Sequence, residues 1–177
     1  MWKRSERYPL KPPLALIEDP QNPPAGARLL NQIENPQAPG EHYLFLANNG
    51  GLSILRAYAG LDGEFRFEQS DFPQRFIDWF VPALRDFRKP AGQDASSRLS
   101  SLAQEVGGEM LTLERGMAVG GDGSPGYIVN NWSRKRYFRG LEGHFMPMNV
   151  AWSDEFLFNG GLIRLFGDLV HLTSNKS

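Results

Sequence analysis

The sequence predicts an α+β fold: a single domain with a mainly antiparallel sheet, one or two packed helices and a proline-rich N-terminal arm. The chain has 177 residues, of which 41% are hydrophobic and 12% aromatic, enough for one domain with its own core. Short apolar runs alternate with glycine-rich and asparagine-rich turns, which is typical of antiparallel strands. One segment, residues 72–87, instead has apolar residues at helical spacing.

The N-terminal arm is predicted from its proline content. Residues 1–40 contain eight of the thirteen prolines. Because proline lacks a backbone N–H and has a fixed φ, this density leaves room only for short elements. We expect a strand at residues 14–17 and one short helix at residues 25–33. The sequence therefore divides into an arm, residues 1–40, and a single α+β domain, residues 41–177.

A three-stranded meander is predicted at residues 43–47, 52–58 and 64–68. The phrase Asn48-Asn49-Gly50-Gly51 separates the first two strands. Asparagine and glycine tolerate the positive φ that a tight hairpin turn requires, so we expect a hairpin here. The related phrase Asn159-Gly160-Gly161 predicts a second hairpin for the same reason.

The clearest helix is predicted over residues 72–87, with Pro73 in its first turn. Pro82 is expected to kink this helix or end it early. The apolar stripe predicts that four side chains face the core: Phe76, Phe80, Leu84 and Phe87. A second, weaker helix is predicted at residues 97–106, ending at Gly107-Gly108, because glycine commonly ends helices.

The rest of the chain is predicted to form strands, because its apolar runs are short and frequently interrupted by glycine. These strands are expected at residues 110–113, 117–119, 127–132, 135–138, 144–152, 155–158, 162–166 and 169–172.

Charge and composition limit the classes of partner. Nineteen Lys and Arg against twenty Asp and Glu give a net charge of −1, so no whole-chain field attracts nucleic acid or an anionic membrane. No apolar run approaches the roughly 20 residues of a membrane span, and no signal peptide is recognisable. We expect a cytoplasmic protein that binds neither membrane nor nucleic acid. The sequence leaves its oligomeric state open.

Catalytic signatures are missing from the sequence. The chain has no cysteine, and its three histidines, His42, His144 and His171, do not have metal-ligand spacing. The glycine-rich loop at residues 120–126 lacks the Gly-Lys-Ser/Thr ending of a phosphate loop, and Asp122 replaces the first glycine of a nucleophile elbow around Ser124. We therefore predict no catalytic residue, no cofactor and no metal, and expect that the protein is not an enzyme.

One stretch mixes cations with aromatic residues, a composition that suits nucleic acid, a solvated edge strand or a protein partner. We interpret it as a partner-binding face, because arginine and aromatic residues supply most interface hot spots. The predicted contact residues are Trp132, Arg134, Lys135, Arg136, Tyr137 and Arg139, with Asp122 and Ser124 from the neighbouring loop. These side chains are expected to be exposed, so that reversing Arg134 and Arg136 to glutamate leaves the fold intact.

Two phrases of the sequence resemble landmarks of the SUKH superfamily of toxin-immunity proteins. The segment at residues 43–51 runs from a Phe-Leu step into Asn-Gly-Gly, and Gly121-Asp122-Gly123 leads into Gly126-Tyr127-Ile128-Val129. Pro36 and Pro39 occupy the stretch where the superfamily has an amphipathic helix with a Leu-Pro step. The resemblance implies an α+β domain that binds and neutralises a bacterial toxin or effector without a reaction of its own.

The leading hypothesis is thus a non-catalytic protein-binding module, in its most specific form an immunity protein with a cognate toxin as partner. One alternative is a small enzyme or ligand-binding protein with a pocket between sheet and helix, using His144, Asp154 and Tyr127. Another is a structural protein of a phage or secretion machine, whose N-terminal arm lies across a neighbouring subunit.

Overall fold

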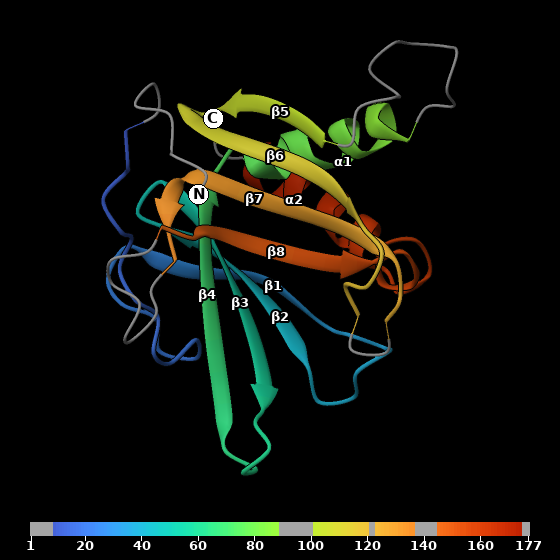
Figure 1. Ribbon diagram of the computed structural model, residues 1–177. Coiled ribbons are helices and arrows are strands. Elements are labelled where there is room, and N and C mark those ends of the chain that lie inside the picture. The colour runs from blue at the N-terminus through green and yellow to red at the C-terminus, as the bar shows by residue number, and fades with distance from the viewer. Residues whose placement is uncertain (1–8, 89–100, 121–122, 137–144, 175–177) are drawn as a thin grey trace.

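The computed structural model describes residues 9–88, 101–120, 123–136 and 145–174 and contains two four-stranded antiparallel sheets with helices packed against them (Figure 1). The α+β prediction is therefore confirmed. The first sheet consists, in spatial order, of β1 (Ala27–Glu34), β2 (His42–Asn48), β3 (Gly51–Ala59) and β4 (Phe65–Pro73). The second consists of β5 (Ser101–Val106), β6 (Glu109–Gly116), β7 (Gly126–Lys135) and β8 (Pro147–Ser153). The helices are α1 (Phe76–Phe87), the π-helix η2 (Glu155–Asn159) and α2 (Leu162–Ser174).

The predicted meander is present as β2, β3 and β4, and the first hairpin is confirmed. Asn48 pairs with Gly51, and the two residues between them, Asn49 and Gly50, have φ of 48° and 85°. Positive φ at both central positions gives a turn whose twist matches that of the flanking strands.

Two predicted helices are strands in the structure. Residues 27–34, which overlap the helix expected at 25–33, form β1 and pair with β2, and a register shift between Leu29 and Asn31 interrupts the alternation expected of a strand. The helix predicted at 97–106 is β5 over its described part. Gly107 and Gly108 have φ of 56° and 81° and turn the chain back into β6, so they form a hairpin rather than end a helix.

Residues 14–17, predicted as a strand, are extended but pair with no strand. The segment instead lies on the outer face of the first sheet. There Ile17 is buried with four residues of β2 and β3: Leu44, Leu46, Leu55 and Ala57.

The C-terminal strand predictions are wrong. Residues 155–158 lie in η2, and residues 162–166 and 169–172 lie in α2. The buried residues of α2 are Leu162, Leu165, Phe166 and Leu169, whose spacing of three and four is helical. The second Asn-Gly-Gly phrase is consequently no hairpin, because Gly161, with φ of 91°, leads from η2 into α2.

The remaining strand predictions are partly right. Strands β6 and β7 contain residues 110–113 and 127–132, while residues 117–119 form no strand. Strand β7 continues to Lys135, and residues 137–138 of the strand predicted at 135–138 lie outside the described residues. Strand β8 begins at Pro147, later than the predicted 144.

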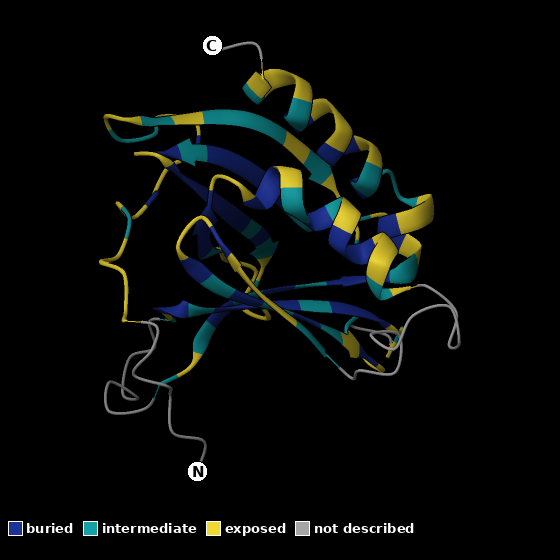
Figure 2. Ribbon diagram, turned by 90° about the horizontal axis from the view of Figure 1, so that it is seen from above, coloured by how far each residue is buried: buried dark blue, intermediate teal, exposed yellow. Residues whose placement is uncertain are grey.

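The core lies between the two sheets and the helices, where the buried residues gather (Figure 2). Helix α1 begins at Phe76, because Phe72 and Pro73 belong to β4, and it continues past Pro82 to Phe87. Phe76, Phe80 and Leu84 are buried as predicted, and Phe87 packs at the edge of the core. The ring of Phe80 lies 5.4 Å from that of Trp152 on β8 and 5.0 Å from that of Phe166 on α2.

Replacing Phe80 with alanine is expected to lower the free energy of unfolding by about 3–5 kcal/mol. The substitution removes the ring through which α1 contacts α2 and β8, and it leaves a cavity. Urea denaturation of wild type and variant measures this loss. Met117→Ala, at an exposed position, is the control and is expected to change stability by less than about 0.5 kcal/mol. An equal loss in both variants would contradict the assigned role of Phe80.

Candidate functional site

Arg134 was predicted to be an exposed contact residue. This prediction is wrong, because Arg134 is buried. Only 8% of its surface is accessible. Its guanidinium forms an ion pair with Glu109 of β6 and donates a hydrogen bond to the carbonyl oxygen of Pro12 at 2.9 Å. Arg134 therefore holds the N-terminal segment against the second sheet.

The Glu109 carboxylate also connects Arg134 to the junction between the two sheets. Asn131 of β7 donates through Nδ2 to Glu109 Oε1 at 3.2 Å and to the carbonyl oxygen of Asp71 on β4 at 3.0 Å. The Asp71 carboxylate accepts a hydrogen bond from Ser53 Oγ at 2.6 Å. Burial raises the pKa of the Asp71 carboxyl above its ordinary value, although hydrogen bonds from Ser53 and Gln69 oppose this effect.

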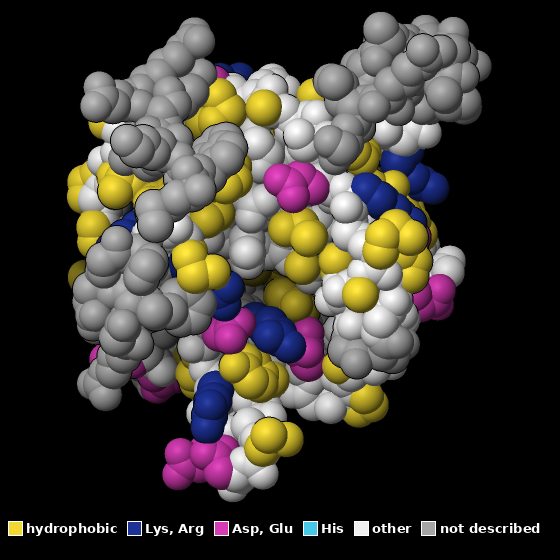
Figure 3. Space-filling model, viewed as in Figure 1, with side chains coloured by type: hydrophobic (Ala, Val, Ile, Leu, Met, Phe, Trp, Pro, Cys, Tyr) yellow, Lys and Arg dark blue, Asp and Glu magenta, His cyan; other side chains and the backbone are white. Residues whose placement is uncertain are grey.

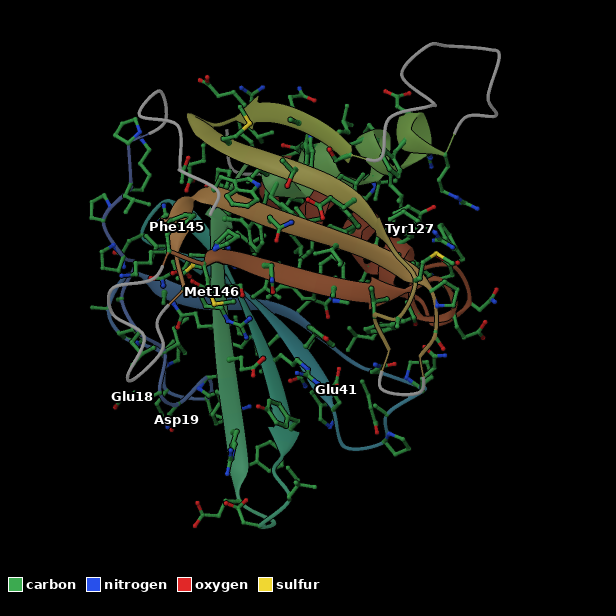
Figure 4. The ribbon with its side chains drawn as sticks, in the orientation of Figure 1. Glu18, Asp19, Glu41, Tyr127, Phe145 and Met146 are labelled. Carbon is green, nitrogen blue, oxygen red and sulfur yellow. The ribbon has the colours of Figure 1, made fainter. Side chains whose placement is uncertain are left out.

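The structure separates the other predicted contact residues. Trp132 donates to Thr112 Oγ1 at 2.9 Å, and its ring lies 6.2 Å from that of Phe145, at the end of the second sheet away from Glu41 (Figure 4). Lys135 is exposed at the end of β7. Tyr137, Arg139 and Asp122 lie outside the described residues.

Arg136 lines a cleft that the sequence did not predict, and Ser124 contacts Gln37 at one end of it. The cleft has a volume of about 480 Å³ and lies between the inner face of the first sheet and β8. Figure 3 shows the hollow at the centre of the molecule, with charged side chains around a hydrophobic floor. The apolar lining residues include Tyr43, Ile54, Val150, Trp152 and Phe156.

Two arginines and two glutamates surround this floor. Arg56 of β3 pairs with Glu41 at 3.1 Å and with Glu68 of β4 at 3.4 Å, and Arg136 lies 3.6 Å from Glu68. Burial acts to lower the pKa of Arg56, but the hydrogen bond to Glu41 and the nearby charges of Glu41 and Glu68 together outweigh burial and raise that pKa. The two charge types balance, so the cleft offers both donors and acceptors without a net preference for anions or cations.

The outer edge of β8 supplies backbone groups to the cleft. On one side of β8, the Asp154 N–H donates to the carbonyl of Pro125, which precedes β7. On the opposite side, the carbonyl of Asn149 accepts a hydrogen bond from Ser70 Oγ at 2.7 Å. Because backbone groups alternate sides along an antiparallel strand, the N–H and C=O of Ala151 point the same way as those of Asn149. The described residues offer Ala151 no hydrogen-bond partner on that side.

Gln37 closes one end of the cleft. Its Oε1 accepts a hydrogen bond from Ser153 Oγ at the end of β8, and its Nε2 lies 3.4 Å from Ser124 Oγ. The cleft therefore has a defined end, where the loop between β1 and β2 meets the loop before β7.

A second cavity, of about 620 Å³, lies near the β2–β3 hairpin and the start of α1. It is lined by Lys11, Arg75, Glu109 and Arg134, among others. Glu109 and Arg134 already bind each other there, whereas the cleft has a free strand edge. We therefore take the cleft as the candidate site.

Two residues of the alternative enzyme hypothesis, Asp154 and Tyr127, both contact Arg115. Asp154 accepts two hydrogen bonds from Arg115, one of them at 2.7 Å, and this guanidinium also lies 4.6 Å from the ring centre of Tyr127. His144 lies outside the described residues. In the described part of the chain, no three histidine, aspartate or glutamate side chains are placed to hold a metal ion.

No family model matches the chain, and no curated protein matches it. Among the described helices, none is long and apolar enough to span a membrane.

Arg134→Met is expected to lower the free energy of unfolding by about 3–5 kcal/mol, because it leaves Glu109 buried without its charge partner. Chemical denaturation measures the loss. Arg136→Met is the matched control, because Arg136 is more exposed and its contact with Glu68 contributes at most about 1 kcal/mol. If the two variants lose the same stability, Arg134 does not have the structural role assigned to it.

Asp71 is expected to make stability depend on pH. Its folded-state pKa is raised, so between the ordinary value of 3.8 and the raised value the folded chain binds more protons than the unfolded chain. Stability from this group therefore falls as pH rises through that window. Relative to Asp71→Asn, which does not titrate there, wild type should gain stability as pH is lowered from 7 and level off near 3.8. Urea titrations at several pH values test this, and a difference independent of pH would contradict it.

Proposed function

We propose that this protein is a non-catalytic protein-binding module that takes an extended segment of its partner into the cleft as an added strand on β8. The observation that carries this proposal is the Ala151 edge, whose N–H and C=O point into the cleft without a partner among the described residues. Backbone N–H and C=O groups are strong hydrogen-bonding groups, so an extended peptide gains regular bonds by pairing with them.

The dimensions of the cleft suit such a segment. The edge of β8 from Asn149 to Ser153 lines the cleft and covers about 13 Å at 3.3 Å per residue, the length of four or five peptide residues. Side chains of an added strand alternate between two faces. One set would face the floor at Trp152 and Tyr43, with Arg56 and Glu68 beside it, and supply the specificity.

The resemblance to SUKH proteins supports a bacterial toxin as the partner, and thus an immunity function. In the structure, the first resembling phrase forms the β2–β3 hairpin and lines the second cavity, while Gly126 begins β7. Of the described residues in the two phrases, only Tyr43, the first residue of the first phrase, lies on the floor of the cleft. The cleft supports the binding mode, whereas the resemblance supports the class of partner.

Ala151→Pro is expected to abolish peptide binding without unfolding the chain. Proline removes the N–H that faces the cleft, and an edge strand tolerates this because the group is not part of the ladder to β7. Peptides of about eight residues would be selected from a random display library on wild-type protein and measured by calorimetry. We expect Ala151→Pro to weaken their binding at least about 100-fold, and the amide signals of Ala151 and Ser153 to shift in wild type on binding.

Ala151→Thr is the matched control, because it keeps the N–H and suits a strand. It should bind the selected peptides within about threefold of wild type, and circular dichroism should show that both variants are folded. Selected peptides that bind the proline variant as tightly as wild type would contradict strand addition at β8.

A further inference from the structure

A second feature is the projecting end of the β3–β4 hairpin, whose strand β4 also supplies Glu68 to the cleft. Figure 1 shows this hairpin extending beyond the rest of the molecule. Leu61 at its tip is fully exposed, and Phe65 and Phe67 on β4 are 60% and 41% exposed. The two phenylalanine rings lie 5.9 Å apart on one face of the strand. Exposed aromatic residues grouped in this way mark an interaction surface.

The outer edge of β4 is free at this end among the described residues. The Gly60 N–H donates to the Glu64 carbonyl across the hairpin, which places the even-numbered residues of β4 in the ladder with β3. The odd-numbered residues direct their backbone groups outward. At Asp71 these groups are occupied, because the N–H donates to Met148 Sδ and the carbonyl accepts from Asn131. At Phe65 and Phe67 no described residue occupies them.

We propose that two copies of this chain associate through this edge, with their β4 strands paired antiparallel about a two-fold axis at Phe67. Phe67 of one copy then faces Phe67 of the other, and Phe65 faces the partner's Gln69. Both pairs consist of odd-numbered residues, whose N–H and C=O point outward, so each pair can exchange two backbone hydrogen bonds. The two first sheets become one eight-stranded sheet.

The charges of β4 favour this register over one centred on Arg66 or on Glu68. With the axis at Phe67, Arg66 lies opposite the partner's Glu68, and the symmetry repeats this pair. Opposite charges across strands stabilise pairing, and like charges directly opposite destabilise it. An axis at Arg66 would place arginine against arginine, and one at Glu68 would place glutamate against glutamate. Arg66 and Glu68 also occupy a pair without backbone hydrogen bonds, where opposite side chains approach most closely.

Self-association is favoured over a different partner because the strand complements itself. An isologous interface must place each residue against its symmetry mate in a compatible way, and the alternation of phenylalanine with arginine and glutamate does so in this register. The hairpin also projects from the body, so the distal part of β4 lies away from the second sheet.

Sedimentation equilibrium and light scattering would test this with the full chain. We expect a dimer with a dissociation constant below about 100 μM. Arg66→Glu should raise this constant at least about tenfold by placing two glutamates opposite each other twice, and Phe67→Pro should do so by removing the central N–H. Arg28→Glu, an exposed charge reversal on β1 at the other edge of the same sheet, is the control and should leave the constant within about twofold.

A mixing experiment tests the register. Glu68→Arg alone should weaken self-association, but an equal mixture of Arg66→Glu and Glu68→Arg chains restores opposite charges at both pairs and should form a heterodimer. A wild-type chain that remains monomeric at about 100 μM would overturn the proposal. It would also be overturned if Arg66→Glu and Phe67→Pro weakened the dimer no more than Arg28→Glu. Failure of the mixture to associate would overturn the Phe67-centred register.

Discussion

The arrangement of the two sheets depends on one side chain, Asn131 of β7, which is fully buried where β4 crosses the second sheet. Its Nδ2 donates to a backbone carbonyl of β4 and to the Glu109 carboxylate of β6. A buried carboxylate needs a charge partner, and Arg134 supplies it. Arg134 in turn binds the carbonyl of Pro12, so the same chain of contacts fixes both sheets and the N-terminal segment.

The cleft follows from this junction. Near the crossing, the edge of β4 is hydrogen-bonded to the second sheet. Asp71 bonds to Met148 of β8 and Asn131 of β7, and Ser70 bonds to Asn149 of β8. Beyond the crossing the two sheets diverge, and no strand among the described residues pairs with the outer edge of β8 as far as Ser153. In this region the inner face of the first sheet carries Arg56 and Glu68, because these positions lie outside the apolar core.

The sequence predicted the parts of the fold that local chemistry decides. The β2–β3 hairpin was predictable because Asn49 and Gly50 must adopt positive φ, and α1 because its apolar stripe is regular. The helix α2 was missed because Gly167 and the preceding glycines suggested turns, although Leu162, Leu165, Phe166 and Leu169 have helical spacing. For β1, the bulge near Leu30 hid the alternation of the strand.

The candidate site was less predictable, because its residues come from segments far apart in the chain. Glu41, Arg56, Glu68 and Arg136 are spread over ninety-five positions and meet only through the crossing of the sheets. The alternation of charged with aromatic residues along β4 was the available signal, and it indicates an exposed strand face rather than a cleft. Arg134 shows the opposite error, since a cation beside aromatic residues suggested a surface, whereas Glu109, 25 residues earlier, makes it an interior group.

The two sheets together have four outer strands, and each outer edge is a place where another chain can pair. A register shift interrupts the edge strand β1, and β5 is short. The edges of β4 and β8 are protected only where they cross. Their distal parts remain free among the described residues because the divergence that opens the cleft also separates them. The junction that stabilises the fold thus determines which strand edges remain available for binding, one inside the cleft and one on the projecting hairpin.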